Sequence, residues 1–329
     1  MASSVSMEWE SRLGRRLRIR DVYILATVVK CGSMAKAARQ LAMSQPSVSE
    51  AIANLEHVLR VRLLDRGPQG VVSTIYADAL LKRGAVVFDE LRQGVRDIEH
   101  LADPAAGQVT IGCAESFMAG LLPAIIERLS RRHPKIVVHA EYAQHATTEF
   151  RELRERNFDL VIGRISEPFA QDEFTFEPLY EEEYLVVVGS KSRWARRRKV
   201  ELAELLDEPW ILMPSNIVIS SLVEAAFRRS GLKVPQERVA SLSMHLRTHL
   251  LATGNFLTVM PNSMFRFNAE RWSLKALPID LGIQSRQVGI ITLKHRTLSP
   301  VVELVFEHAR AVAKSIQSST RPAKRSAPC

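Results

Sequence analysis

Four short polar side chains on one predicted helix are the most chemically informative residues of this chain. Within residues 21–66, apolar residues at helical spacing predict two short amphipathic helices joined by a tight turn. Small residues on the first helix permit the close crossing that a helix-turn-helix requires. The second helix then presents Gln45, Ser47, Ser49 and Glu50 outward, and such side chains can face the base edges in a DNA major groove.

Three further residues indicate where these helices begin. Ser33 and Ser44 each precede a helical run, where a hydroxyl can accept hydrogen bonds from free backbone N–H groups. Pro46 falls in the first turn of the second helix, where its missing N–H costs little. The alternative is a packed helical pair without a DNA-binding role, but the length of the ordered pattern favours DNA binding.

The run GSMAKAARQLAMSQPSVSEAIANLE closely resembles the DNA-binding signature of LysR-type transcriptional regulators, and LLDRGPQGVVST resembles their wing. Val61, Leu64 and Ala77 replace the usual glycine, phenylalanine and glycine of the family, and Glu50 stands where a basic or amide residue is common. The resemblance implies a DNA-binding set in which Arg66 is a wing-adjacent arginine: Ser33, Ser44, Gln45, Pro46, Ser47, Ser49, Glu50 and Arg66.

Charge and composition agree with a nucleic-acid partner. The 329-residue chain has a formal net charge of +9, and residues 1–66 hold eleven Lys/Arg against six Asp/Glu. Three widely spaced cysteines, without a CxxC pair, predict a reducing compartment and no structural disulfide. No apolar run approaches a membrane span, and residues 1–20 do not resemble a secretion signal, so we expect a cytoplasmic protein without a membrane partner.

Residues 76–102 predict a long helix with an apolar seam. The seam positions alternate in steps of four and three, as in a two-stranded coiled coil: Leu80, Gly84, Val87, Leu91, Gly94, Ile98 and Leu101. The alternative is an amphipathic helix that packs only on its own domain. The resemblance favours dimerisation, because the linker helix of this family pairs antiparallel, and a dimer can read two half-sites.

From Gln108 onward, strands and helices alternate, which predicts an α/β fold. The first helix is expected at FMAGLLPAIIERLSRR, and the strands are expected at QVTIGCA, KIVVHAEYA, FDLVIGRI, EEEYLVVVG, PWILM, FLTVM and QVGIITLKH. This part resembles the type II periplasmic-binding-protein fold of the family's effector domain, preceded here by a helix-rich winged helix-turn-helix and the long linker helix. The expected division is an extension, a DNA-binding domain, a dimerisation helix, a two-lobed effector domain and a disordered basic tail: residues 1–17, 18–76, 77–105, 106–312 and 313–329.

Candidate effector-binding residues stand where strands end. Ser116 and Phe117 follow a strand at the predicted start of a helix, where free N–H groups favour an anion, and the family places an effector-contacting hydroxyl at the position of Ser116. Arg164 follows the strand FDLVIG, where a guanidinium could clamp a carboxylate. Ser215, Asn216 and Thr253 complete the set from the second lobe. For each serine or asparagine the alternative is a cap or turn residue, and Thr253 begins the predicted turn TGNFLTVMP.

Enzymatic and metal chemistry find no support in the sequence. His245 and His249 have the i, i+4 spacing of a metal pair, but no third ligand is near in sequence. The chain has no nucleophile elbow, phosphate loop or dinucleotide fingerprint, and no cofactor is expected. Cys113 could be a redox sensor, although a buried strand cysteine is preferred.

These patterns predict an effector-responsive transcriptional regulator that is not an enzyme. Its expected partners are double-stranded DNA, a small-molecule effector, further copies in a homodimer or homotetramer, and RNA polymerase if it activates. Ser116 and Arg164 favour an organic acid or sugar acid, and GVVSTIYADALLKRG is similar to the branch that regulates sugar-binding proteins. Two alternatives stay open: a regulator whose cleft binds no ligand, and an α/β enzyme or solute-binding domain fused to a DNA-binding head.

Overall fold

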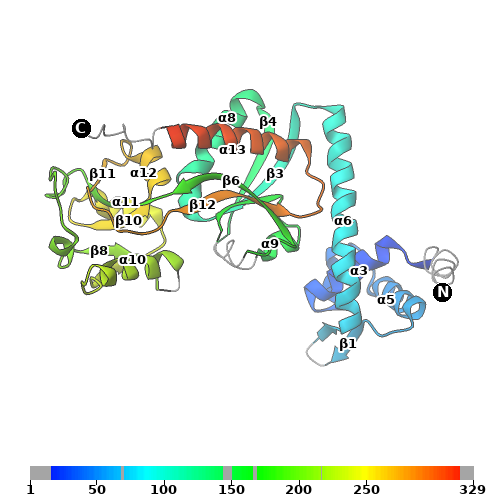
Figure 1. Cartoon of the computed structure of the whole chain (residues 1–329). Helices are drawn as coiled ribbons and strands as arrows, with labels where there is room; N and C mark the ends of the chain where they lie inside the picture. Colours follow the sequence, from blue (N-terminus) through cyan, green and yellow to red (C-terminus); the bar gives the residue numbers. More distant parts are fainter. Residues whose placement is uncertain (1–15, 68–69, 144–149, 166–168, 216, 319–329) are drawn as a thin grey trace. The chain divides into compact units, whose positions relative to one another are not determined.

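The computed structural model describes residues 16–67, 70–143, 150–165, 169–215 and 217–318. The chain divides into two compact units, Met1–Val95 and Arg96–Cys329. Figure 1 shows the helices and strands of the two units. None of the helices in the described ranges is long and apolar enough to span a membrane.

The first unit contains the predicted helix-turn-helix. Its helices are α3 (Ile19–Cys31), α4 (Met34–Gln40) and α5 (Gln45–Leu59), followed by the two-stranded wing of β1 (Leu64–Gly67) and β2 (Gly70–Ser73). The buried faces share one core, whose fully buried members include Leu25, Val28, Ala37, Val48, Ile52 and Leu63. Leu64 and Ala77, two of the departures from the family pattern, are buried in this same core.

The long helix α6 (Ile75–Ala102) confirms the predicted helix but changes its seam. Gly84 is buried against the head: a Cβ there would lie 3.0 Å from Cγ1 of Val22, and Leu80 packs on the same core. Gly84 therefore faces its own domain, unlike the predicted seam position, while Leu80 is only partly covered by that core and its place in a seam stays a prediction. Further along, Leu91 is 52% exposed, Ile98 68% and Leu101 80%.

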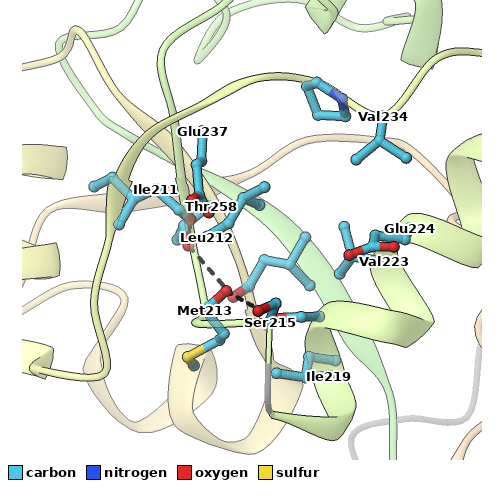
Figure 2. A pocket seen from close by; sticks show the side chains of 13 residues that line it. Ile211, Leu212, Met213, Ser215, Ile219, Val223, Glu224, Val234, Glu237 and Thr258 are labelled. Carbon is cyan, nitrogen blue, oxygen red and sulfur yellow. Dashed lines mark hydrogen bonds between the residues drawn. The ribbon is translucent and has the colours of Figure 1, made fainter.

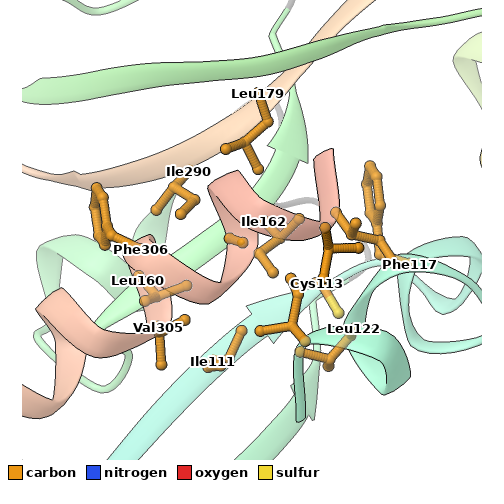
Figure 3. Close-up of a cluster of buried hydrophobic side chains, with 14 of the residues drawn as sticks. Ile111, Cys113, Phe117, Leu122, Leu160, Ile162, Leu179, Ile290, Val305 and Phe306 are labelled. Carbon is orange, nitrogen blue, oxygen red and sulfur yellow. The ribbon is translucent and has the colours of Figure 1, made fainter. Parts of the chain in front are cut away.

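The second unit has two lobes, each built on a five-stranded mixed sheet. Lobe I has the strand order β4-β3-β5-β12-β6. Its parallel strands are β3 (Ala106–Cys113), β4 (Lys135–Tyr142) and β5 (Leu160–Arg164), while β12 (Arg286–Leu293) runs antiparallel to β5 and β6 (Phe174–Glu182). The helices are α7 (Glu115–Met118), α8 (Leu121–Arg132), α9 (Arg151–Arg154) and α13 (Pro300–Ser318). Figure 3 shows the core between sheet and helices, including Ile111, Cys113, Phe117 and Ile290.

Lobe II has the strand order β11-β7-β10-β8-β9. Its strands are β7 (Tyr184–Gly189), β8 (Trp210–Leu212), β9 (Glu237–Ala240), β10 (Leu257–Pro261) and β11 (Leu274–Ala276). The helices are α10 (Val218–Arg229), α11 (Met244–Ala252) and α12 (Asn262–Asn268), together with the 3-10 turn η2 (Leu202–Leu205). The chain leaves lobe I after β6 and returns to it at β12, so the two lobes are joined by two crossings.

Three expectations about the second unit need correction. The helix predicted from Phe117 to Arg132 is divided at Gly120, where a Cβ would meet the Ser116 carbonyl and Cα of Met264, each at 3.1 Å. The predicted disordered tail began at residue 313, but α13 continues to Ser318 because Ala313 and Ile316 are buried in the lobe I core. Strands β6, β9 and β11 were not predicted; β9 and β11 are short, and β6 carries a mixed polar pattern.

Candidate functional site

The polar face of α5 is accessible, as a DNA-reading helix requires. Gln45, Pro46, Ser47 and Glu50 are exposed in the first turns of this helix, and Ser49 is half-buried. Val48 and Ile52, which alternate with them, are fully buried. The helix therefore has one face fixed in the core and one face of short hydrogen-bonding side chains, the arrangement in which a recognition helix enters a major groove.

The two predicted caps are present. Ser33 Oγ accepts a hydrogen bond from the backbone N–H of Lys36 at 3.5 Å, and Ser44 Oγ accepts one from the N–H of Ser47 at 3.2 Å. The hydroxyls of Ser44 and Ser47 also share a hydrogen bond of 2.8 Å. Ser33 and Ser44 thus satisfy free N–H groups of α4 and α5, and their first role is to set where these helices begin.

The wing is held to the helix-turn-helix by residues that the predicted set lacks. Gly70 has φ of +121° and a Cβ there would lie 2.5 Å from the carbonyl oxygen of Gly32, so only glycine fits. Next to it, the N–H of Val71 donates to that same carbonyl at 3.0 Å. The carboxylate of Glu56 accepts from the N–H groups of Leu63 at 2.8 Å and Leu64 at 3.3 Å. Arg66 is exposed on β1 within this fixed ribbon.

In the second unit, the structure brings three predicted effector residues together. Arg164, at the end of β5, donates from Nη1 to Ser116 Oγ at 3.3 Å, and its guanidinium carbon lies 4.3 Å from the centre of the Phe117 ring. Ser116 lies in the four-residue helix α7, not at the start of a long helix. The expected helix-dipole contribution to anion binding is therefore small, and the contact with Arg164 is the feature that defines this cluster.

A buried carboxylate that the sequence did not reveal neutralises Arg164. Glu182, at the end of β6, accepts from Arg164 Nη2 at 3.3 Å, and their side chains are 1% and 12% exposed respectively. It also accepts from the N–H of Ser263 at 2.9 Å and from its hydroxyl at 2.6 Å. Glu182 therefore connects lobe I to α12 of lobe II, directly at the first crossing between the lobes. In the sequence, the position of Glu182 shortly before the apolar run YLVVVG was the only signal for this contact.

The electrostatics of this cluster follow from burial and pairing. Burial acts to lower the pKa of Arg164, but its neighbours Tyr184 and Glu182 outweigh that effect, and the net pKa lies above the ordinary value. Burial and the adjacent Glu182 raise the pKa of the Tyr180 phenol, whose hydroxyl bonds the Glu182 carboxylate at 3.2 Å. Arg164 is thus a charged but already compensated donor, which suits a polar ligand atom better than it suits a second carboxylate.

The remaining predicted effector residues do not join this cluster. Ser215 is exposed and lines a cavity of about 230 Å³ within lobe II, shown in Figure 2 with Met213 and Thr258. Asn216 lies outside the described residues. The Thr253 hydroxyl donates to the Leu250 carbonyl at 2.6 Å in its own turn, which is the cap-or-turn alternative. We therefore leave Thr253 out of the site.

The geometry of the described residues supports neither a metal site nor a reactive thiol at Cys113. Among the residues that the structure describes, no group of three or more His, Cys, Asp or Glu side chains could hold a metal ion. Cys113 is fully buried in the lobe I core, and burial raises its pKa to about 12. Since the thiolate is the reactive form, this favours the structural interpretation of Cys113 over the redox one.

A helix-turn-helix with an accessible polar helix, followed by a two-lobed α/β unit, is the architecture of DNA-binding regulators that carry an effector-binding domain. Two family models match: the bacterial regulatory helix-turn-helix of the LysR family at residues 19–77, and the LysR substrate-binding domain at residues 102–314. The chain belongs to the LysR family of transcriptional regulators, which are DNA-binding proteins with an effector-binding domain and are not enzymes.

Individual relatives agree with this assignment over most of the chain. It is 26% identical to the regulator GbpR of Azospirillum brasilense, covering 92% of this chain and 88% of that one. It is 24% identical to the regulator TdcA of Escherichia coli K12, covering 89% and 92%. Among solved structures, the LysR family regulator CbnR matches with a TM-score of 0.61 and 17% identity, over 90% and 99% of the two chains. Such identities show the family without separating its branches.

Proposed function

We propose that this regulator binds an interrupted inverted repeat as a homodimer or larger homo-oligomer, and that a small molecule bound between the two lobes modulates it. The observation that carries the proposal is the pairing of Ser116 and Arg164 beside contacts that join the lobes. Ser116 and Arg164 belong to lobe I, and Glu182, which holds Arg164, is bonded to Ser263 of lobe II. A change of lobe orientation alters the contact between Glu182 and Ser263, and Arg164 links this contact to Ser116. A ligand that contacts Ser116 therefore acts on the orientation of the lobes.

The DNA-binding set is the exposed face of α5 together with the wing: Gln45, Pro46, Ser47, Ser49, Glu50 and Arg66, with Ser33 and Ser44 as caps. Gln45 and the serines contact bases, because their short side chains stand at the accessible start of the helix. Arg66 contacts phosphate and adds affinity without sequence preference. The exposed apolar residues of α6 favour a second copy as the partner of this helix.

A short path connects the effector residues to the linker helix. Arg96 of α6 donates to Asp159 at 2.7 Å, Asp159 directly precedes β5, and β5 ends at Arg164. A ligand that shifts Arg164 thereby acts on the strand that anchors the end of α6. The ligand can change DNA binding only by its different affinity for the two lobe arrangements, typically about 1–3 kcal/mol of coupling.

The experiment titrates DNA from the promoter beside the chain's own gene, with and without a set of organic acids, sugar acids and sugars. We expect one ligand class to change affinity or bend angle, and Ser116→Ala to shift this response to higher ligand concentration while ligand-free DNA binding stays near wild type. Ser130→Ala is the matched control, because among the described residues the hydrogen bond of that exposed lobe I serine lies within its own helix, at the Ile126 carbonyl. A response that Ser116→Ala leaves unchanged would remove Ser116 from the site.

The alternative of a ligand-silent cleft predicts that no compound raises the melting temperature of the protein. We also propose a cytoplasmic location and, if the regulator activates, contact with RNA polymerase; both follow from the family and from the need to reach promoter DNA. A thermal-shift screen separates the two functional alternatives before any DNA experiment is done.

A further inference from the structure

One buried cation of lobe II is hydrogen-bonded to no acidic side chain among the residues that the structure describes. Arg247, on α11, is fully buried with 0% of its surface exposed. Its described hydrogen-bond partners are Thr258 Oγ1, the Val259 carbonyl and the sulfurs of Met213 and Met244, and no carboxylate is among them. Buried charges in proteins are normally paired, so this arrangement is unusual and costly.

The donors of this guanidinium are incompletely used. Nη2 donates at 2.6 Å to Thr258 Oγ1 and at 2.7 Å to the Val259 carbonyl. Within the described part of the chain, the partners of Nη1 are the two thioethers, Met213 Sδ at 3.7 Å and Met244 Sδ at 3.6 Å, and Nε has none. Thioether sulfur is a weak acceptor, so Nη1 lacks the oxygen partner that a charged donor requires. Burial lowers the pKa of Arg247 to about 10, against an opposing effect of Glu115, and the side chain stays charged at neutral pH.

One of the two methionines that contact Nη1 lies in the wall of a cavity, and the other is bonded to a residue of lobe I. Met213 follows β8 and forms part of the wall of the 230 Å³ cavity of lobe II (Figure 2). Met244 begins α11, and its N–H donates at 2.8 Å to the carboxylate of Glu115, the lobe I residue next to Ser116. Methionine side chains change rotamer at low cost, so the side chains of Met213 and Met244 can move away from Nη1.

Arg247 and Arg164 differ in the charged groups that surround them. Arg164 is paired with the buried Glu182, whereas Glu115 acts on Arg247 through its charge and is not among the described hydrogen-bond partners of that guanidinium. Within the cavity, aliphatic residues dominate the wall, and Glu224 and Glu237 stand apart from Met213 in Figure 2. An acidic group near those two glutamates would be repelled, so a carboxylate in this cavity is favoured only at its Met213 end.

We propose that Arg247 is the anion-recognising residue of the effector site, and that it selects a small organic carboxylate. The carboxylate replaces the thioethers of Met213 and Met244 as the acceptor for Nη1, and the apolar part of the ligand lies along the aliphatic wall. This inference rests on the proposed effector function and specifies the chemical class of the ligand. The negative charge of the ligand is then recognised by Arg247 of lobe II and not by Arg164 of lobe I.

The test compares straight-chain carboxylates of two to six carbons, each with its own amide, on the full-length protein by calorimetry and thermal shift. Each pair has nearly the same shape and differs in charge. We expect at least one carboxylate to bind and raise the melting temperature, with its amide binding at least tenfold more weakly. Arg247→Met, which replaces the side chain by an apolar one, should lose at least tenfold in affinity for that carboxylate, and Arg247→Lys should lose less.

Arg229→Met is the matched control, because Arg229 is a lobe II arginine that binds the backbone carbonyls of Leu281 and Gly282. If Arg247→Met does not fold by circular dichroism, the carboxylate and amide pairs on the wild type and on Arg247→Lys still decide. Equal binding of amide and carboxylate, wild-type affinity in Arg247→Met, or no binding by any carboxylate would overturn the inference. An uncharged compound that binds and changes DNA affinity would overturn it while leaving the proposed effector function intact.

Discussion

Replacing Leu91 with lysine places a charge in the exposed apolar stripe of α6 and tests whether this stripe is the dimer contact. Leu91 is 52% exposed in the single chain, so about half of its side chain is available for burial by a partner. Complete burial of a leucine contributes about 1.5–3 kcal/mol, so covering this half contributes about 0.8–1.5 kcal/mol per copy. Two symmetry-related copies then contribute about 1.5–3 kcal/mol, or roughly a 10- to 150-fold change in the dimer dissociation constant.

The lysine adds the desolvation of an unpaired charge to this loss, so the effect of Leu91→Lys should exceed that of Leu91→Ala. Sedimentation equilibrium and light scattering measure the association, and operator binding should fall with it. Asp97→Lys is the control, since that exposed residue points about 120° away from Leu91 around the helix. A Leu91→Lys protein that stays oligomeric and protects both half-sites would refute the reasoning, and the contact would have to lie elsewhere.

Further predictions concern readout, phosphate contact, lobe coupling and the buried thiol. Gln45→Ala should lose preference for operator over random DNA, by about 1–3 kcal/mol for one good base contact, which competition binding measures. Arg66→Ala should weaken binding to every sequence and reduce the slope of log affinity against log salt by about 1, as a salt titration shows. Glu182→Gln leaves Arg164 without its counter-charge and should cost about 3 kcal/mol in urea unfolding; an unchanged midpoint would mean that the pair adds no stability. At pH 8 an alkylating reagent should label Cys31 but leave Cys113 unlabelled until the protein unfolds, because burial raises the Cys113 pKa to about 12, as peptide mass spectrometry can establish.

The helix-turn-helix was predictable from the sequence because local signals and burial agree there. Ser33 and Ser44 cap the helices that they precede, and Val48 and Ile52 are buried at the spacing that predicted them. The seam of α6 was only partly predictable. Heptad spacing records which positions are apolar, but it does not record whether Gly84 meets a partner helix or Val22 of its own domain.

The effector region was harder to predict because its determinants are far apart in sequence. Ser116 and Arg164 were found because each follows a predicted strand. The role of Glu182 could be recognised only in the structure, where the end of β6 brings its carboxylate to Arg164. The sequence analysis did not single out Arg247, because its burial depends on contacts with residues of β10, which follows α11 in the chain. The last turns of α13 did have a signal in the sequence, since Ile316 continues the helical spacing of Val305, Ala309 and Val312 before the polar run begins.

The most direct test of the central claim is a footprint of the full-length protein on DNA upstream of its own gene. Two recognition helices held by one dimer must contact two half-sites on the same face of the duplex, separated by about 10 bp or a multiple of it. The account predicts two protected half-sites with this spacing, and loss of both together when 5 bp are inserted between them. Protection of a single half-site, or equal binding after the 5 bp insertion, would contradict it.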